Sequence, residues 1–423
     1  MQTSIRILRI VLPLLFVAFL LLIGLSYTRS AGLNQTTAES ERSDIRQEKP
    51  RVIAHEFEDT HSIGGRVISR IRARRTMGFD SGWYTLEDVE MTIFRKNGEA
   101  YQVAAPQAQF KADTKEAEAK GGVRITSSDG IEIATREIHF DGRRLVNRIP
   151  VRFRVDQWRG TAESVDLDVP EEKLELAQGV TATMTPAAPG EPPMTLRARS
   201  VLFDRTSGAA DFRGEIRLTR QQDSLEADQM TARFDQNRRI LVGLEGEGNV
   251  RFHIRSESAI RPAATGASGG GAKLIRSERF IAAIGGQGEI RGITLLGENE
   301  PVHATLDGPP RREITARKFV VDVNQEVVTA VRAETEAMVA EPETRREMQA
   351  NRIQLYLDQN SGRLSSAYLE GGILIRDPQS EARADRATYD VGAGVVLLTA
   401  GKGGAPSIRT EGHLVKAEVI EIS

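Results

Sequence analysis

The sequence predicts an all-β protein: an elongated, twisted antiparallel stack of many short strands, of the β-jellyroll or β-taco kind, behind one N-terminal transmembrane helix. Three observations predict this architecture. A short motif recurs along almost the whole chain, turn signals return at short intervals, and one long apolar run stands near the N-terminus. A motif that recurs in this way indicates one supersecondary unit stacked many times.

The recurring motif is an alanine, an aromatic or aliphatic residue five positions later, and an aspartate directly after it. A second phrase often follows, in which a glycine and one or two further residues precede an apolar run, as at 121–125 and 371–375. Together the two phrases predict strand, turn, strand, turn in many copies. The copies of the first motif lie at 162–168, 198–204, 316–322 and 384–390, with looser copies ending at Asp141, Asp235 and Asp358.

The apolar run predicts a membrane anchor. It covers residues 10–28 behind Arg6 and Arg9. At 1.5 Å per residue these roughly 19 residues span about 28 Å, close to the hydrocarbon thickness of a bilayer. The flanking arginines favour a cytoplasmic N-terminus. A cleaved signal peptide is the alternative, but Tyr27 and Arg29 stand where small residues would be needed for cleavage.

Strand signals dominate from about residue 52 onward. Residues 84–94 show a partial alternation of apolar and polar residues, typical of a sheet with one covered face. Turn signals rich in Asp, Asn and Gly follow, as at 128–130, 141–142 and 358–362. Asp and Asn side chains form hydrogen bonds with the nearby backbone, and Gly accepts a positive φ. These residues therefore give a physical reason to predict turns. Strands spaced about 8–12 residues apart favour an all-β fold.

Two breaks divide the strand pattern. Residues 185–193 contain four prolines, which cannot donate to a ladder, and residues 262–271 are a low-complexity stretch rich in glycine and alanine. The predicted order is an anchor over 1–30, a flexible periplasmic tether over 31–51, a β-jellyroll over 52–185, a proline-rich linker over 186–194, and a β-repeat module over 195–423 with a disordered insertion near 258–274.

Composition excludes several classes of function. The net charge is −2 and the pI about 6.4, so no global basic field attracts nucleic acid. Cysteine is absent, which excludes disulfides, zinc thiolates and cysteine nucleophiles. The nearest pair of histidines, His55 and His61, lacks a visible set of further metal ligands. No serine stands in a nucleophile elbow. We therefore predict no catalytic residue, no metal site, no cofactor and no enzymatic activity.

The anchor, the tether and residues 65–184 resemble the LptC family, the membrane-anchored periplasmic protein of the lipopolysaccharide export ABC transporter. The second half, from about residue 195, resembles the LptA/OstA repeat, so the chain looks like a fusion of the two. The matching phrases in the first half are IRAR at 71–74, YTLEDV at 84–89, GGVRI at 121–125, SDG at 128–130, FD at 140–141, PV at 150–151 and GTA at 160–162. Those in the second half are LEA at 225–227, LEGEGNV at 244–250 and LEGGI at 369–373.

The resemblance implies a location and partners. The protein would sit in the inner membrane with a single pass, with its N-terminus cytoplasmic and its C-terminal β-domain periplasmic. Its partners would be lipopolysaccharide or a related glycolipid, the permease subunits of an inner-membrane ABC transporter, and further periplasmic or outer-membrane bridge proteins.

Aromatic residues in the strand-like runs are the candidates for lipid binding. Each could simply fill a core, but if the sheets do not close fully they would line a groove for acyl chains. Exposing one CH₂ group to water costs about 0.8 kcal/mol, so exposing a 12-carbon acyl chain costs on the order of 10 kcal/mol. A groove that covers the chain avoids this cost. The candidates are Phe110, Phe140, Phe153, Phe203, Phe212, Phe234, Phe252, Phe319, Tyr356 and Tyr389.

The last strand is the candidate edge for a partner protein, because an unpaired edge can add a strand from another chain. Its residues are Ala417, Val419, Ile420 and Ile422. The leading function is a non-enzymatic lipopolysaccharide bridge that accepts the lipid at the inner membrane and passes it outward. The alternatives are an anchored structural or adhesive β-solenoid, which predicts a filled interior, and a surface-polysaccharide enzyme, which needs converging carboxylates.

Overall fold

The structure is a computed structural model that describes residues 49–422 apart from 96–97, 129, 186–191, 236–239, 255–272, 287–288, 307–310, 325–326, 359–363 and 402–403. All regular structure in these residues is strand, which confirms the all-β prediction. This part of the chain contains no helix able to cross a membrane. The predicted anchor, almost all of the predicted tether, and most of the predicted linker and insertion lie outside the described residues.

Twenty-eight strands follow one another along the described part of the chain. The first fourteen are β1 (Val52–Ile63), β2 (Arg66–Gly78), β3 (Trp83–Phe94), β4 (Ala100–Lys111), β5 (Ala117–Ser127), β6 (Ile131–Phe140), β7 (Arg144–Asn147), β8 (Val151–Val155), β9 (Trp158–Ala162), β10 (Ser164–Asp168), β11 (Lys173–Met184), β12 (Met194–Asp204), β13 (Ala209–Arg220) and β14 (Asp223–Phe234). The others are β15 (Leu241–Ile254), β16 (Lys273–Ile284), β17 (Ile290–Leu296), β18 (Val302–Leu306), β19 (Arg312–Ala316), β20 (Lys318–Asn324), β21 (Val327–Glu341), β22 (Arg346–Leu357), β23 (Leu364–Arg376), β24 (Ser380–Asp390), β25 (Val395–Thr399), β26 (Ser407–Thr410), β27 (His413–Lys416) and β28 (Val419–Ile422).

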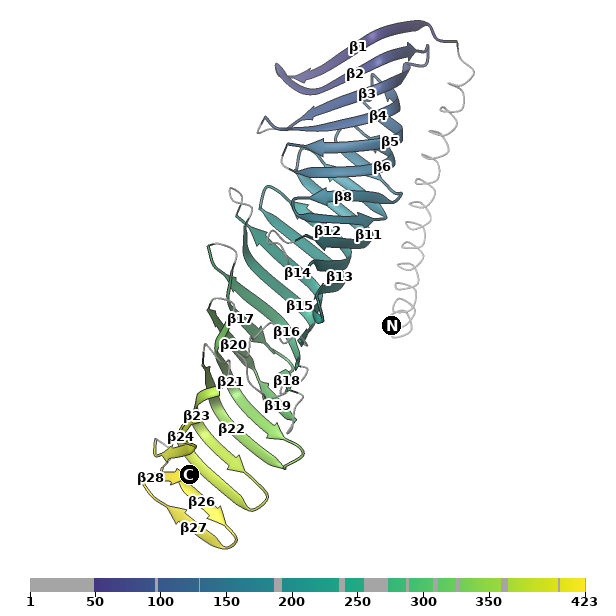
Figure 1. Cartoon of the computed structure of the whole chain (residues 1–423). Coiled ribbons are helices and arrows are strands. Elements are labelled where there is room, and N and C mark those ends of the chain that lie inside the picture. Colours follow the sequence, from purple (N-terminus) through teal and green to yellow (C-terminus); the bar gives the residue numbers. More distant parts are fainter. Residues whose placement is uncertain are drawn as a thin grey trace, which may run out of the picture.

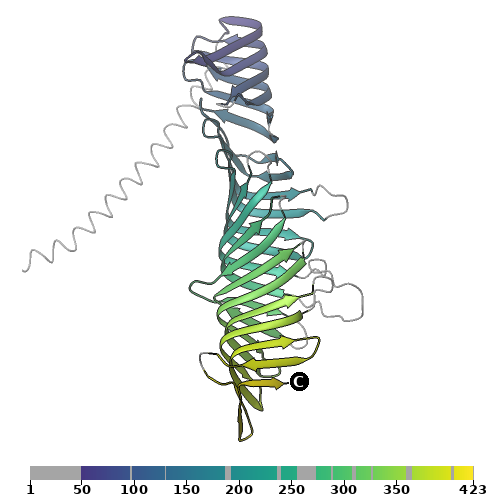
Figure 2. The same ribbon diagram turned by 90° about the vertical axis from the view of Figure 1, so that its left-hand side faces the viewer.

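These strands form one antiparallel sheet that is folded lengthwise into two walls. A long strand contributes one half to each wall, whereas short strands belong to one wall only. Wall 1 contains β8, β9, β18, β19, β26 and β27, and wall 2 contains β7, β10, β17, β20, β25 and β28, as their pairing with opposite halves of β6, β11, β16, β21 and β24 shows. The strands stack along a long, strongly twisted axis from β1 to β28 (Figures 1 and 2).

The line along which the sheet folds, here called the crease, is built from bulges in the middle of the long strands. In β13 the register shifts between Arg213 and Ile216, and φ is 71° at Gly214 and 52° at Glu215. A Cβ added to Gly214 would lie 3.0 Å from the Cβ of Arg199 on β12. Glycine stands here because it accepts the positive φ and leaves room for the neighbouring strand.

This geometry corrects one expectation. The glycine phrase was expected to mark a turn between two strands, but each copy lies at the crease inside one long strand, as in β5 and β23. The alanine motif does end at a turn. Ala198 is buried at the crease, and Asp204, one wall-width further on, accepts hydrogen bonds from the amides of Thr206 (2.9 Å) and Ser207 (3.2 Å). The motif therefore spans half of a folded strand, from the crease to the hairpin turn.

The two halves of the chain form a single sheet. β11 and β12 pair directly, with Leu174 opposite Phe203 and Met184 opposite Met194. Met194, which was assigned to the linker, is already the first residue of β12. The division of the chain into two modules thus coincides with a hairpin and not with a break in the ladder.

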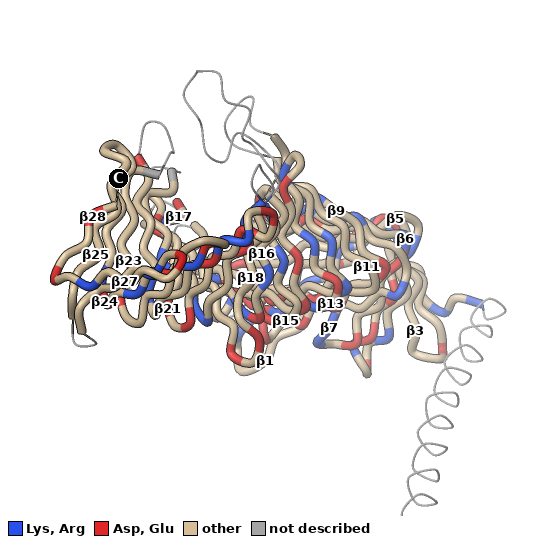
Figure 3. Tube along the Cα trace, turned by 90° about the horizontal axis from the view of Figure 1, so that it is seen from below, with Lys and Arg blue, Asp and Glu red and all other residues tan. Residues whose placement is uncertain are grey.

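Polar residues cover the outside of the walls. Lysine and arginine are interspersed with aspartate and glutamate along the strands (Figure 3). Many are cross-strand pairs, such as Arg199 and Glu215 at 3.0 Å and Lys318 and Glu334 at 3.0 Å. Pairs of this exposed kind contribute little stability each, so burial of the inner face holds the fold together.

Candidate functional site

The inner face of the sheet carries two unbroken rows of apolar residues. Residues directly opposite each other on paired strands share one face of a sheet. In wall 2 the row of opposed positions passes through Tyr84, Phe110, Ala117, Phe140, Leu145, Leu167, Leu174, Phe203, Ala210, Ala232, Leu244, Ala282, Ile293, Val321, Val331, Leu355, Ala367, Tyr389, Val396 and Ile422. We call this row the wall 2 ladder.

Wall 1 carries a matching row, here called the wall 1 ladder. It passes through Ile71, Met91, Val103, Ile125, Ile133, Phe153, Gly160, Ala182, Leu196, Leu218, Leu225, Phe252, Ile275, Ala304, Ile314, Val339, Met348, Ile375, Ala382, Ile408 and Val415. No charged or hydrogen-bonding side chain other than the two tyrosines interrupts either ladder. The apolar interior therefore continues from β2 and β3 to β27 and β28.

Side chains from both walls meet in this interior and fill most of it. Phe252 of wall 1 and Phe280 of wall 2 pack edge to face, with ring centroids 5.4 Å apart. A Cβ added to Gly246, which lies opposite Phe280 in the pairing of β15 and β16, would overlap the Phe280 ring. The interior is thus packed at this level, whereas ladder residues of the second half such as Leu244, Val331 and Leu355 are only partly buried.

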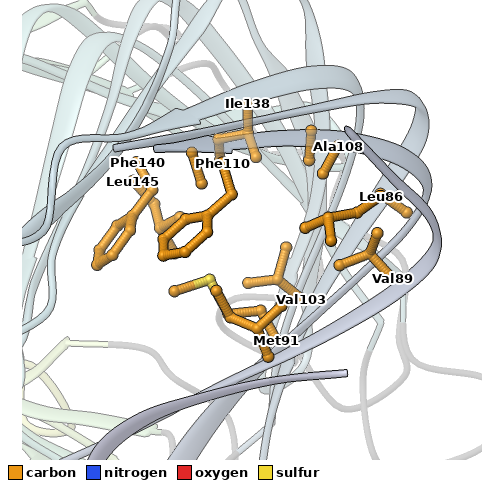
Figure 4. A pocket seen from close by; sticks show the side chains of 13 residues that line it. Leu86, Val89, Met91, Val103, Ala108, Phe110, Ile138, Phe140 and Leu145 are labelled. Atoms are coloured by element: carbon orange, nitrogen blue, oxygen red, sulfur yellow. The ribbon is translucent and has the colours of Figure 1, made fainter. Parts of the chain in front are cut away.

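A cavity of about 30 Å³ remains in the first half, between β2 and β7. Figure 4 shows side chains from both walls pointing into it. A cavity of this size holds about as much as one or two waters, far less than an acyl chain. Its lining consists of Ile71, Leu86, Val89, Met91, Val103, Ala105, Ala108, Phe110, Ala117, Ala119, Ile138, Phe140 and Leu145.

The side opposite the crease is here called the seam. In the described residues each hairpin turn joins two strands of the same wall, and the chain passes from one wall to the other at the crease. The rims of the two walls, where the hairpin turns lie, are thus not connected by the backbone. Parting them along the seam would break no strand pairing.

Nine of the ten aromatic candidates lie on the inner face. Phe110, Phe140, Phe203 and Tyr389 belong to the wall 2 ladder, and Phe153 and Phe252 to the wall 1 ladder, as given above. Phe212, Phe234 and Phe319 have the same parity and pack into the same core. Tyr356 is the exception. Its neighbour Leu355 faces inward, so Tyr356 lies on the outer face, edge-on to Tyr368 at 5.8 Å.

The aromatic selection also missed most of the inner face. Aliphatic members of the wall 2 ladder such as Leu145, Leu167 and Leu174 are almost fully buried and form part of the inner surface beside the aromatic residues. Their signal in the sequence was the period of two, which places alternate residues on one face. Only the cross-strand register showed which positions from different strands are neighbours.

One charged residue belongs to this interior. Arg95 follows Met91 and Ile93 on the inward parity of β3, and 2% of its surface is exposed. Its guanidinium lies 4.8 Å from the centre of the Tyr101 ring. Burial also lowers the pKa of Lys273, which has the inward parity of Ile275 at the wall 1 rim.

The two ends of the sheet have free edges. In the described residues β1 pairs only with β2, and at the other end β28 pairs only with β25 and β27 only with β26. The Ala400 amide donates to the Glu418 carbonyl at 3.4 Å. Because backbone groups alternate in direction along a strand, the amides of Ile420 and Ile422 point to β25, and those of Val419 and Glu421 point outward. Ala417, also a predicted edge residue, precedes this strand and donates its amide to the Pro406 carbonyl.

The described residues contain no group of three or more histidine, aspartate or glutamate side chains that could hold a metal ion. His55 and His61 both lie on β1, at a free edge. Recurring aspartates such as Asp168 and Asp204 accept hydrogen bonds at the hairpin turns. Burial by itself would raise the pKa of Asp168, but hydrogen bonds from Arg143 and from the Glu171 amide outweigh it and lower the pKa. These carboxylates therefore have a structural role in the hairpins.

Comparison with known proteins finds a family match in the first part of the chain. Residues 15–185 match the family described as lipopolysaccharide-assembly, LptC-related. No curated protein matches the chain. A solved structure with some similarity is that of LptH from Pseudomonas aeruginosa, described as the LptA homologous periplasmic component of the conserved lipopolysaccharide transport device. Its sequence identity is 11%, the match covers 33% of this chain and 79% of that chain, and the TM-score is 0.19.

Proposed function

Because residues 15–185 match the LptC-related family, we propose that this chain is a non-enzymatic lipopolysaccharide-binding component of a trans-envelope lipid export bridge. In this proposal the N-terminal run anchors it in the inner membrane and the β-domain lies in the periplasm. Lipid arrives from an ABC transporter permease and leaves toward further periplasmic or outer-membrane bridge proteins. The second half acts as an LptA/OstA-like module of the same bridge.

The observation that carries the proposal is the continuity of the two apolar ladders from β3 to β27 and β28. Each CH₂ group of an acyl chain that is exposed to water costs about 0.8 kcal/mol of free energy. A carrier must therefore offer apolar contact at every point of the path. Two opposed ladders without a polar break provide such a path. The direct pairing of β11 with β12 carries it across the boundary between the two halves.

Where the two walls are packed against each other, they must part when lipid enters. The crease suits this motion, because its bulges and glycines form a flexible line while the seam has no backbone connection. The acyl chain would replace side chains of the opposite wall as the apolar neighbour of each ladder. The exchange keeps apolar surface away from water, and so its free-energy cost is small.

The packed interior also favours the second candidate, an anchored structural or adhesive β-solenoid that binds other envelope proteins. The two candidates differ in one respect that can be measured. A bridge exposes its ladder residues to lipid during transport, whereas a solenoid keeps them packed against the opposite wall.

The test is site-specific photo-crosslinking in cells. A photoreactive amino acid at Phe140, Phe203 or Tyr389 reports on the inner face from the first half to the last strands. The same amino acid at Tyr356 or Arg233, on the outer face of wall 2, is the matched control. We expect lipopolysaccharide adducts at the three inner positions and none at the outer ones.

Two results would contradict parts of this proposal. Equal capture at inner and outer positions, or none at either, would favour the solenoid. Capture at Phe140 without capture at Phe203 and Tyr389 would show that the second half is not part of the lipid path.

A further inference from the structure

Arg95 stands at the seam with its charge turned toward the interior. The alternation of β3 places Val89, Met91, Ile93 and Arg95 on one face, and the first three are buried apolar residues. Met91 lines the cavity, four residues from Arg95. At about 3.3 Å per residue, the backbone of Arg95 therefore lies roughly 13 Å along the chain from that of Met91.

The partners of Arg95 come from both walls. Glu99, in the same hairpin of wall 1, lies 2.9 Å from the guanidinium. Glu172, in the turn between β10 and β11 of wall 2, lies 3.7 Å from it. The side chain of Arg95 is 1% exposed and that of Glu172 is 20% exposed. The Arg95–Glu172 pair thus joins the rims of the two walls across the seam, where no backbone connection exists.

Stability alone does not account for a charge in this place. A buried ion pair gains little over well-packed apolar residues, because removing both charges from water costs about as much as their attraction returns. Breaking the pair on one side, however, leaves a buried charge that needs a new partner. An arginine whose partner can be displaced is suited to bind a carboxylate or a phosphate through its planar fork.

We propose that Arg95 and Glu172 form a latch over the seam, and that an amphiphile with an anionic headgroup opens it by taking the place of Glu172 on Arg95. The ligand class is an acylated molecule that carries a phosphate or carboxylate, with its chain directed along β3 toward the cavity. This inference rests on the proposed function, since it names the group that admits the lipid. It adds a binding site for the headgroup at the seam, where the lipid would enter the apolar interior.

The experiment compares two probes with the same alkyl chain on the full chain, which an amphipol keeps soluble in the absence of free detergent. Dodecyl phosphate carries an anionic head and dodecyl maltoside a neutral one, both below their micelle-forming concentrations. The variants are Glu172→Gln, Arg95→Gln and Arg95→Lys. Glu215→Gln is the matched control, because Glu215 pairs with Arg199 at 3.0 Å on the exposed crease.

We expect Glu172→Gln to bind dodecyl phosphate on the order of tenfold more tightly than the wild type, because the competing carboxylate is gone. Its affinity for dodecyl maltoside should change much less. Arg95→Gln should lose the preference for the anionic probe, and Arg95→Lys should keep part of it. Hydrogen exchange at Tyr101 and Val169 should speed up in Glu172→Gln and stay unchanged in Glu215→Gln.

The outcomes separate this inference from the proposed function. If every variant keeps the wild-type ratio of affinities, or if neither probe binds, the latch is wrong, while lipopolysaccharide capture at Phe140, Phe203 and Tyr389 would still support the bridge. If those positions capture no lipid, the bridge fails whatever the probes do. Equal loss of stability in Glu172→Gln and Arg95→Gln, with no change in the ratio, would show a purely structural ion pair.

Discussion

Thr335 occupies a position at the crease where β5, β13, β15 and β23 have glycine. Its φ is 65° and that of the next residue, Glu336, is 56°. A β-branched residue in the left-handed region is strained, because its Cβ substituents crowd the backbone. The bend of the sheet imposes this conformation on β21, and Thr335 adopts it although its own preference is for an extended strand.

We expect Thr335→Gly to stabilise the protein by about 1 kcal/mol. Relief of strain worth about 1–3 kcal/mol exceeds the greater entropy that glycine gives to the unfolded chain, about 0.5–1 kcal/mol. Urea unfolding of the two proteins measures the difference. The control is Thr315→Gly on β19, which lies in extended backbone and should lose stability. A loss of stability in Thr335→Gly would show that the crease is not strained at this residue.

At the scale of single elements, carboxylates stabilise the hairpin turns at the wall 2 rim. Asp168 ends β10, accepts the Glu171 amide at 3.1 Å and pairs with the Arg143 guanidinium at 3.0 Å. It also lies 3.4 Å from Arg144. Only the ionised carboxylate accepts all of these hydrogen bonds at full strength, which explains why they lower its pKa in spite of the burial that opposes them.

A depressed pKa makes the stability depend on pH with a definite sign. The unfolded chain binds a proton near the ordinary value of 3.8, and the folded chain binds it only at lower pH. The contribution of Asp168 is therefore fully present above that value and is lost as pH falls through the folded pKa. We expect Asp168→Asn to lose about 2 kcal/mol at pH 7, and the difference from the wild type to shrink below about pH 4.

Urea unfolding of both proteins between pH 7 and pH 3 checks this prediction. Asp80→Asn is the control, because Asp80 pairs with Arg51 where both side chains are largely exposed. It should cost little at any pH. A difference for Asp168→Asn that does not vary with pH would show that the ionised carboxylate is not the stabilising form.

The whole molecule is an open-ended stack, and its two end strands decide what it can join. β28 exposes the backbone of Val419 and Glu421, while Ile420 points its amide toward β25 and is 9% exposed. A free edge of this kind can accept a strand from a partner protein. In the proposed bridge, this edge recruits the next component.

We expect Val419→Pro to weaken that recruitment without unfolding the chain, because proline removes an amide that points outward. A photo-crosslinker at Glu421 measures recruitment as the yield of protein adducts in cells. Ile420→Pro is the comparison, since it removes an amide directed to β25 and should lower stability as well. An adduct yield that Val419→Pro leaves unchanged would exclude strand addition at this edge.

Much of the architecture follows from local patterns in the sequence. The period of two, the turn residues and the alanine–aspartate motif predicted the all-β stack, since strand conformation and turn geometry depend on near neighbours. The same patterns placed nine of the ten aromatic candidates on the inner face. Arg95 was not predicted, although the alternation from Val89 onward reaches it on the buried side.

The sequence by itself determined that strands form, where many of the hairpins turn, and that the first part of the chain resembles LptC. Only the tertiary structure decided that the glycine phrase bends a strand instead of ending it, that Tyr356 faces outward, and that Arg95 meets Glu172 across the seam. These features depend on register and on the folding of one wall against the other. Both bring together residues far apart in the chain, and a one-residue change in register would exchange the inner and outer faces.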